Sequence, residues 1–156
     1  MLFRSREGVE AAFIAVGDNA ARARLGAMLE GFALPAAVHP AAIVSPSAVV
    51  GPGAVVMARA VLGCEARLGR LAILNTGAIA EHDVALEECA HAAPGSVLCG
   101  HAVLGARALL GAGAAVRPGV RIGADAVVGV GAAVVMDVPD GARVGGVPAM
   151  TLGGAT

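Results

Sequence analysis

The feature that most constrains this chain is a repeat of six residues. Residues 38–139 divide without an insertion into 17 blocks of six, from VHPAAI at the start to VVMDVP at the end. The first position is Val, Leu or Ile in 15 blocks and Ala in two, and the fifth is always Ala, Val or Ser. Glycine is second in seven blocks. Neither the 3.6-residue period of a helix nor the two-residue period of a strand produces this pattern.

A triangular coil explains the repeat. Each block supplies one short strand and one corner, with the aliphatic first residue and the small fifth residue pointing inward, and we expect glycine to ease the turn. Three blocks make a coil of 18 residues, so residues 18 apart stack at about 4.8 Å. The 17 blocks give a little under six coils. We therefore predict an all-β fold, a parallel β-helix of hexapeptide repeats.

The ends of the chain do not follow the period. Segment 12–19, AFIAVGDN, predicts a strand, and segment 20–34 predicts a helix from the spacing of its apolar residues Leu25, Met28, Leu29 and Phe32. One strand and one helix bury too little surface to fold alone. We interpret residues 1–37 as the remnant of an α/β subdomain that packs on the coil or a neighbour, and residues 140–156 as a Gly/Pro-rich exit segment.

Composition narrows the class of protein. Gly, Pro or a charge interrupts every apolar run before the roughly 18 residues of a membrane span, so we expect no membrane association. A net charge of −1 and 2% aromatic residues argue against nucleic acid as a partner, since basic patches and stacking rings are lacking. The three cysteines, Cys64, Cys89 and Cys99, form no CxxC pair and are interpreted as reduced thiols of a cytoplasmic protein.

Five segments in order resemble the hexapeptide-repeat sugar O- and N-acetyltransferases, which include sialic acid O-acetyltransferases and bacillosamine-pathway acetyltransferases. The segments are AFIAVGDNAAR, VHPAAIVSPSAVVGPG, NTGAIAEHD, AHAAPGSVLCG and GGVPA, within residues 12–150. The resemblance implies a left-handed parallel β-helix and a nucleotide-sugar-binding N-terminal region, of which residues 1–37 keep only the last strand and helix. It also implies a homotrimer with three interfacial sites, acetyl-CoA as the co-substrate, and a sugar or nucleotide sugar as the acetyl acceptor.

The stretch NTGAIAEHDV, residues 75–84, carries the candidate catalytic pair. Acetyl transfer from a thioester needs a base to take the acceptor's proton, and histidine suits this role because its pKa lies near working pH. His82 and Asp83 are third and fourth in the block AEHDVA, where a corner lets both side chains face outward. The resemblance makes His82 the general base and Asp83 the acid that supports it. The alternative is a solvated corner pair.

His91 is the second candidate. The resemblance places it against acetyl-CoA near the thioester, although an unremarkable surface histidine is the alternative. His91 follows His82 by half of a coil, so the two lie on opposite sides of the triangle, about 15 Å apart from the strand rise. They cannot share a site within one chain, and neighbouring subunits must bring them together.

Further residues enter by the resemblance alone. Asn75 matches a position near the acceptor, with a left-handed corner residue as the alternative. Ala112 and Val130, which are one coil apart, match backbone contacts to the pantetheine arm, and the loop at 146–148 matches one that encloses coenzyme A. We expect Gly100 to leave room for a ligand beside His82. His39 and His101 are interpreted as structural or solvated, and no metal is expected.

Two other functions stay open at this point. The first is a non-catalytic trimeric β-helix scaffold. The second is a zinc enzyme similar to the γ-type carbonic anhydrases, which bind zinc through three histidines on the same fold. It would use His82, His91 and His101, whose spacing does not match that family. The acceptor remains open among sialic acid, a UDP-linked amino sugar and a perosamine-type nucleotide sugar.

Overall fold

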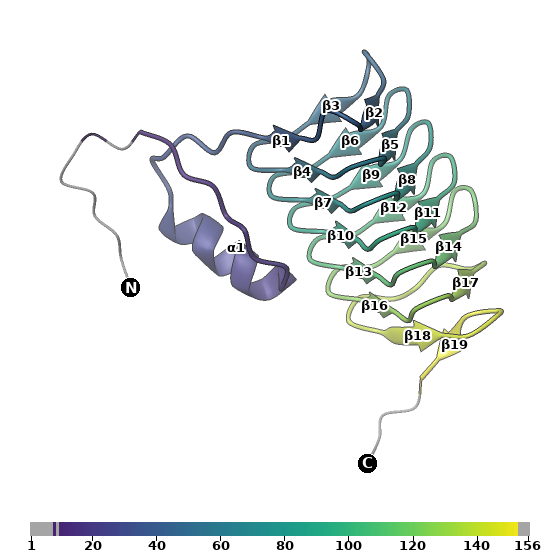
Figure 1. Cartoon of the computed structure of the whole chain (residues 1–156). Coiled ribbons are helices and arrows are strands. Elements are labelled where there is room, and N and C mark those ends of the chain that lie inside the picture. Colours follow the sequence, from purple (N-terminus) through teal and green to yellow (C-terminus); the bar gives the residue numbers. More distant parts are fainter. Residues whose placement is uncertain (1–7, 9, 153–156) are drawn as a thin grey trace.

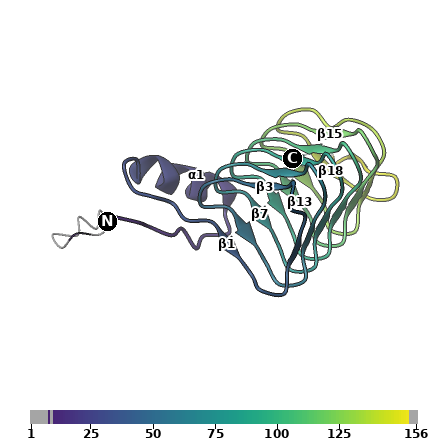
Figure 2. The same ribbon diagram turned by 90° about the horizontal axis from the view of Figure 1, so that it is seen from above.

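The computed structural model describes residue 8 and residues 10–152. The ends of the two flanking segments, at residues 1–7, 9 and 153–156, lie outside the described residues. The described chain is one short helix followed by a stack of coils (Figure 1). Viewed from above, the coils lie over one another with three sides, and the helix lies beside them (Figure 2). The predicted β-helix is confirmed.

Three parallel sheets form the three sides. The first contains β1 (Ala37–Val38), β4 (Val55–Val56), β7 (Ile73–Leu74), β10 (His91–Ala92), β13 (Leu109–Leu110), β16 (Val127–Val128), β18 (Arg143–Gly145) and the antiparallel β19 (Met150–Thr151). The second contains β2 (Ile43–Val44), β5 (Val61–Leu62), β8 (Ile79–Ala80), β11 (Val97–Leu98), β14 (Ala115–Val116) and β17 (Ala133–Val134). The third contains β3 (Val49–Val50), β6 (Arg67–Leu68), β9 (Ala85–Leu86), β12 (Val103–Leu104) and β15 (Arg121–Ile122).

The register of the strands follows the predicted period. Ile73 pairs with His91, and His91 pairs with Leu109, each one full coil further along the chain. The first position of every block from Val56 to Val134 is at most 2% exposed. The fifth position is buried as well, from Ala54 to Val138. The interior is therefore a column of stacked Leu, Val, Ile and Ala side chains, filled without aromatic rings.

The period ends earlier than the sequence pattern suggested. Val138 pairs with Ile122 and Arg143 pairs with Val127, each separated by less than a full coil. The last block is thus shortened by two residues, and part of the expected exit segment adds strand β18 to the first sheet. A carboxylate fills the gap in the ladder, because Asp137 Oδ1 accepts a hydrogen bond of 2.8 Å from the backbone N–H of Arg121.

The corner glycines act differently from the expectation. The left-handed backbone falls on the fourth position of every block from Gly53 to Gly131, including eight residues that are not glycine. The second-position glycines have no such φ. A Cβ on Gly105 would lie 2.7–2.8 Å from backbone atoms of residues 122–124 in the next coil. At Gly105 a glycine is needed because the coils approach closely, whereas the turn itself is made two residues later.

The N-terminal segment differs from the prediction in two ways. Segment 12–18 forms no strand, and the only bridge beside it among the described residues is the isolated one between Ala11 and Ala33. The helix α1 spans Asn19–Met28, and its buried residues are Arg22 and Gly26. The apolar Leu25 and Met28, expected to face the core, are 36% and 49% exposed.

Arg22 is the contact that holds this segment against the β-helix. Its side chain is 1% exposed, and its guanidinium donates to the carbonyls of Leu71 and Cys89 on two successive coils, at 2.8 and 2.7 Å. The same group donates to the carbonyls of Val16 and Gly17 at 3.0 and 2.9 Å. The arginine therefore ties four backbone acceptors together, which explains why a charged residue occupies the buried face of α1.

The close approach of the coils yields a stability prediction. The change Gly105→Ala places a methyl group against the backbone of the next coil, so we expect destabilisation by about 1–3 kcal/mol. The control is Gly113→Asn, where φ is 65° with open space around the glycine and asparagine tolerates the conformation. Thermal unfolding followed by circular dichroism measures both. Equal midpoints for the two variants would contradict the proposed role of the second position.

Candidate functional site

Two histidine sites lie on different parts of the triangle. His82 and Asp83 occupy the corner between β8 of the second sheet and β9 of the third. His91 opens β10 in the first sheet and faces the N-terminal segment. Two grooves are lined by His91, and neither of them includes His82 or Asp83.

The first site is an exposed histidine–aspartate pair. Asp83 Oδ2 lies 2.9 Å from His82 Nδ1, and both side chains are about half exposed. Since an ionised carboxylate only accepts hydrogen bonds, Nδ1 carries the proton and donates it to Asp83. The Nε2 atom is then left with its lone pair, which is the arrangement that a general base requires.

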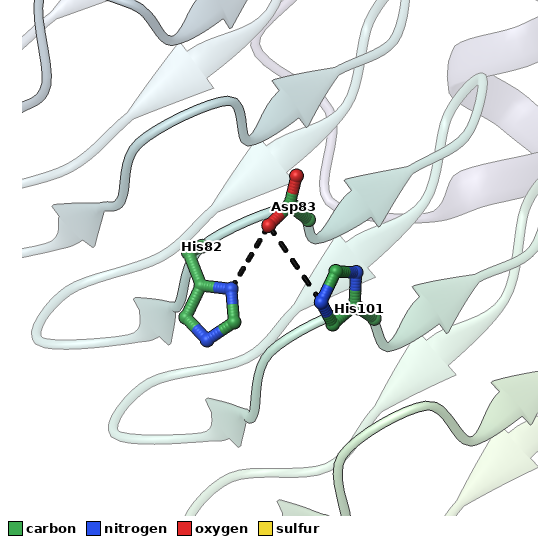
Figure 3. Close-up of side chains that lie close together, drawn as sticks. All are labelled: His82, Asp83 and His101. Atoms are coloured by element: carbon green, nitrogen blue, oxygen red, sulfur yellow. Dashed lines mark hydrogen bonds and ion pairs between the residues drawn. The ribbon is translucent and has the colours of Figure 1, made fainter.

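His101 also belongs to this corner, although the sequence predicts only a structural or solvated residue at this position. Its Nε2 lies 3.8 Å from Asp83 Oδ2, and its ring meets that of His82 edge to face with centroids 5.1 Å apart. Figure 3 shows the two rings on either side of the carboxylate. The signal was present in the sequence, because His101 follows Asp83 by one full coil and so occupies the same corner position in the next turn.

Gly100 has a role different from the one expected. A Cβ at this position would collide with the His82 ring, with Cε1 and Nε2 as the nearest atoms. The glycine therefore makes room for the imidazole itself. His82 consequently lies over the backbone of the next coil, which fixes where its Nε2 atom points.

The second site joins Asn75 and His91. Asn75 Oδ1 accepts a hydrogen bond of 2.7 Å from the Thr76 N–H, which orients the amide. Asn75 Nδ2 therefore faces His91 Nε2, at 3.0 Å, and donates to it. The Nε2 atom of His91 is an acceptor, and the second amide hydrogen of Asn75 is free of this contact. Two residues expected to bind different substrates thus form one pair.

Burial and charge both act on His91. Its pKa is lowered chiefly by burial and further by the nearby Arg22 guanidinium, while a hydrogen bond with the Gly17 backbone raises it. Burial is the larger effect, so His91 is held as the neutral imidazole. The buried Arg22 contributes a positive charge next to this pocket without a carboxylate among its hydrogen-bond partners.

His91 lies where two hollows meet. One, of about 660 Å³, runs between the N-terminal segment and the first sheet, and its lining includes Phe13, Val16, Ile73, Asn75 and His91. The other, of about 430 Å³, continues beyond Gly17 past Asn19 and Arg107. Asn19 is held there because its Nδ2 donates to the Arg107 carbonyl at 2.8 Å. The groove depends on the segment that Arg22 anchors.

The two remaining candidates lie on the same corner as Asn75, between the first and second sheets. Gly131 N–H donates to the Ala112 carbonyl at 2.9 Å, so the corners that contain Ala112 and Val130 stack in successive coils. Val130 is 80% exposed. Asn75, Ala112 and Val130 therefore follow one edge of the β-helix along its axis, and a long ligand on this edge could reach all three.

Cysteine and metal chemistry take simple forms among the described residues. All three cysteines are free, and Cys89 is buried, which raises the pKa of its thiol. The three histidines that a γ-type zinc site would require do not come together, because His91 lies outside the cluster of His82, Asp83 and His101.

Helix α1, the one helix among the described residues, has 10 residues and is too short to cross a bilayer.

Solved structures resemble this chain over most of its length. The GDP-perosamine N-acetyltransferase of Caulobacter crescentus, solved with coenzyme A and GDP-perosamine, is 46% identical with a TM-score of 0.92, over 94% of this chain and 70% of that one. The acetyltransferase domain of PglB from Neisseria gonorrhoeae FA1090 is 40% identical with a TM-score of 0.88, over 91% and 70%. This chain belongs to the hexapeptide-repeat sugar acetyltransferases.

A third structure agrees with this assignment. WeeI from Acinetobacter baumannii AYE is 25% identical with a TM-score of 0.77, over 96% of this chain and 74% of that one. No protein-family model matches the chain, and no curated protein matches it significantly. The fold of the acetyltransferase described here is the left-handed parallel β-helix of its structural neighbours.

The environment of His91 predicts how stability changes with pH. A histidine whose pKa is lowered on folding contributes stability above its ordinary value of about 6.5, and this contribution is lost as pH falls through the folded pKa. Wild type should therefore lose more thermal stability between pH 7.5 and 5.5 than His91→Gln, which has no titrating ring. Melting curves at both pH values test this, and an identical acid loss in the two proteins would contradict it.

Proposed function

We propose that this acetyltransferase moves the acetyl group of acetyl-CoA to the amino group of a nucleotide-linked sugar. The observation that carries the proposal is the His82–Asp83 pair, in which a carboxylate fixes the tautomer and leaves Nε2 free to take a proton. The relative from Caulobacter crescentus was solved with coenzyme A and GDP-perosamine. This favours a nucleotide amino sugar over sialic acid or a sugar hydroxyl as the acceptor.

The reaction assigned to the pair is direct transfer. The acceptor nitrogen attacks the thioester carbonyl, His82 Nε2 takes the proton that the nitrogen loses, and Asp83 stabilises the imidazolium that forms. As the tetrahedral intermediate collapses, the C–S bond breaks and the thiolate of coenzyme A receives that proton from His82. No cysteine takes part as a nucleophile in this scheme.

The Asn75–His91 pair is the proposed site of the thioester. His91 accepts one amide hydrogen of Asn75 and so orients the other, which we assign to the carbonyl oxygen as it becomes an oxyanion. Ala112 and Val130, on the same edge, would contact the pantetheine arm through their backbone. This assignment adds to the expectation from the sequence, which placed His91 near the thioester and Asn75 near the acceptor. In it, His91 acts by positioning the Asn75 amide.

A homotrimer would complete the site. His82 and Asp83 occupy a corner that is remote in the triangle from the groove of His91, and a cyclic trimer places a corner of one subunit against the flank of the next. The acceptor and coenzyme A would then bind between subunits, with the base supplied by one and the thioester pocket by its neighbour. Free thiols and the use of acetyl-CoA are consistent with a cytoplasmic location.

Release of coenzyme A from acetyl-CoA tests the role of His82. Removing the base in His82→Ala should lower kcat by about 10²–10⁴-fold while acetyl-CoA binding is kept. Asp83→Asn should lower kcat with little change in KM, because the amide no longer holds the Nδ1–H tautomer. The control is Glu65→Gln, because Glu65 is exposed and occupies the same corner position as Asp83 in the preceding coil.

The acceptor panel for this measurement contains GDP- and UDP-linked amino sugars, free amino sugars and sialic acid. Transfer by wild type that persists in His82→Ala would contradict the assigned base. Wild type that binds acetyl-CoA but transfers to no acceptor would contradict the proposed activity and favour a non-catalytic scaffold.

A further inference from the structure

The corner that contains the catalytic pair has more metal-binding atoms than proton transfer needs. His82, Asp83 and His101 each offer one ligand atom, and these atoms all lie within 4.8 Å of one another. In the part of the chain that the structure describes, no other group of three such side chains comes this close. The mechanism above uses two of the three residues and leaves His101 without a role.

The coil register fixes how the three side chains meet. His101 follows Asp83 by one coil, and the His101 N–H donates to the His82 carbonyl at 3.0 Å. Asp83 and His101 share the left-handed corner conformation, with φ of 59° and 60°, so their side chains leave the backbone in parallel. Figure 3 shows Asp83 between the two rings, with both of its ring contacts on the same oxygen.

The donor set and its size suit a transition metal. Two imidazole nitrogens and one carboxylate oxygen are ligands typical of Zn²⁺, whose bonds of about 2.0–2.2 Å in a tetrahedron hold ligand atoms roughly 3.3–3.6 Å apart. The distances from Asp83 Oδ2 to His82 Nδ1, 2.9 Å, and to His101 Nε2, 3.8 Å, bracket this separation. All three side chains are exposed, so they can rotate slightly, and water can supply the fourth ligand. Mg²⁺ and Ca²⁺ prefer sites made of oxygen alone.

We propose that His82, Asp83 and His101 form a binding site for Zn²⁺ or a similar transition-metal ion, and that the bound ion switches off acetyl transfer. The metal takes the lone pair of His82 Nδ1, so the ring proton moves to Nε2 through solvent. A neutral imidazole bound in this way has no lone pair at Nε2 and cannot accept the acceptor's proton. Metal binding and general-base action are therefore mutually exclusive at His82.

Binding of the ion does not depend on the enzyme's activity, whereas inhibition rests on the proposed function of His82. The two parts are tested separately. The first experiment titrates untagged protein with Zn²⁺ by isothermal calorimetry and with Co²⁺ by its visible absorption, which also reports thiolate ligands. The variant is His101→Asn, because asparagine tolerates the left-handed backbone at this corner.

Two controls match this variant. His39→Asn removes another exposed histidine, which lies on a different corner. Cys64→Ser removes the exposed thiol of the coil that precedes His82. We expect one metal ion per wild-type chain, affinity weakened about tenfold or more in His101→Asn, and wild-type affinity in both controls. Absence of binding in wild type, or equal weakening in His39→Asn or Cys64→Ser, would overturn the site.

The second experiment measures acetyl transfer with increasing Zn²⁺. Inhibition should follow the calorimetric binding curve, reverse on addition of a chelator, and require about tenfold more Zn²⁺ in His101→Asn, matching its weakened binding. Metal that binds at the site without inhibiting transfer would overturn the switch and would leave the binding site standing. Wild type that binds metal but never transfers acetyl groups would instead contradict the proposed function.

Discussion

Pairing of each coil with the next is the interaction on which the rest of this structure depends. The backbone ladder places equivalent block positions above one another, so every position in the block becomes a column along the axis. The first and fifth columns form the core, the glycines of the second column lie where successive coils approach closely, and the fourth column turns the corner. His82, Asp83 and Asn75 occupy corners, where a polar group is not placed in the interior, whereas His91 lies on strand β10 with its side chain outside the core. This register brings His82, Asp83 and His101 together at one corner.

The N-terminal segment adds what a bare coil lacks, which is a concave surface. Leu71 and Cys89 are buried although they stand at corner positions, because the helix and the preceding segment cover them. Together with Ile14 they form a second, smaller apolar cluster outside the β-helix. Arg22 links this cluster to the groove, since the carbonyls that it binds belong both to the covered corners and to the loop beside His91. The pocket is therefore a property of the docked segment as much as of the coil.

The sequence predicted the β-helix and its core well. The six-residue period reflects which positions of the block are buried, and the 17 blocks repeat the same pattern. It placed His82 and Asp83 on a corner for the same reason. Where the repeat gave no information, prediction failed. Nothing in the spacing of Leu25 and Met28 indicates that Arg22 is the buried face of α1, because its partners are backbone carbonyls 49 and 67 positions away. The direction of the hydrogen bond between Asn75 and His91 depends likewise on the neighbouring Thr76 amide.

Some of the features that the prediction missed were visible in the sequence. The apolar fourth residues Leu71 and Cys89 stand where most other blocks place glycine or a charged residue, which marks the coils that another segment covers. His101 could have been joined to Asp83 by adding one coil length. The shortened last coil was hidden, because Val138 fits the small fifth position and the inward first position equally well.

In the proposed trimer one subunit supplies the base and its neighbour supplies the thioester pocket, so complementation between inactive variants would reveal the shared site. His82→Ala and His91→Ala chains with different affinity tags would be produced together, and trimers that carry both tags isolated. Every such mixed trimer contains one intact interface of three, so we expect about one third of wild-type activity. Mixed trimers as inactive as the two parents would contradict a site shared between subunits.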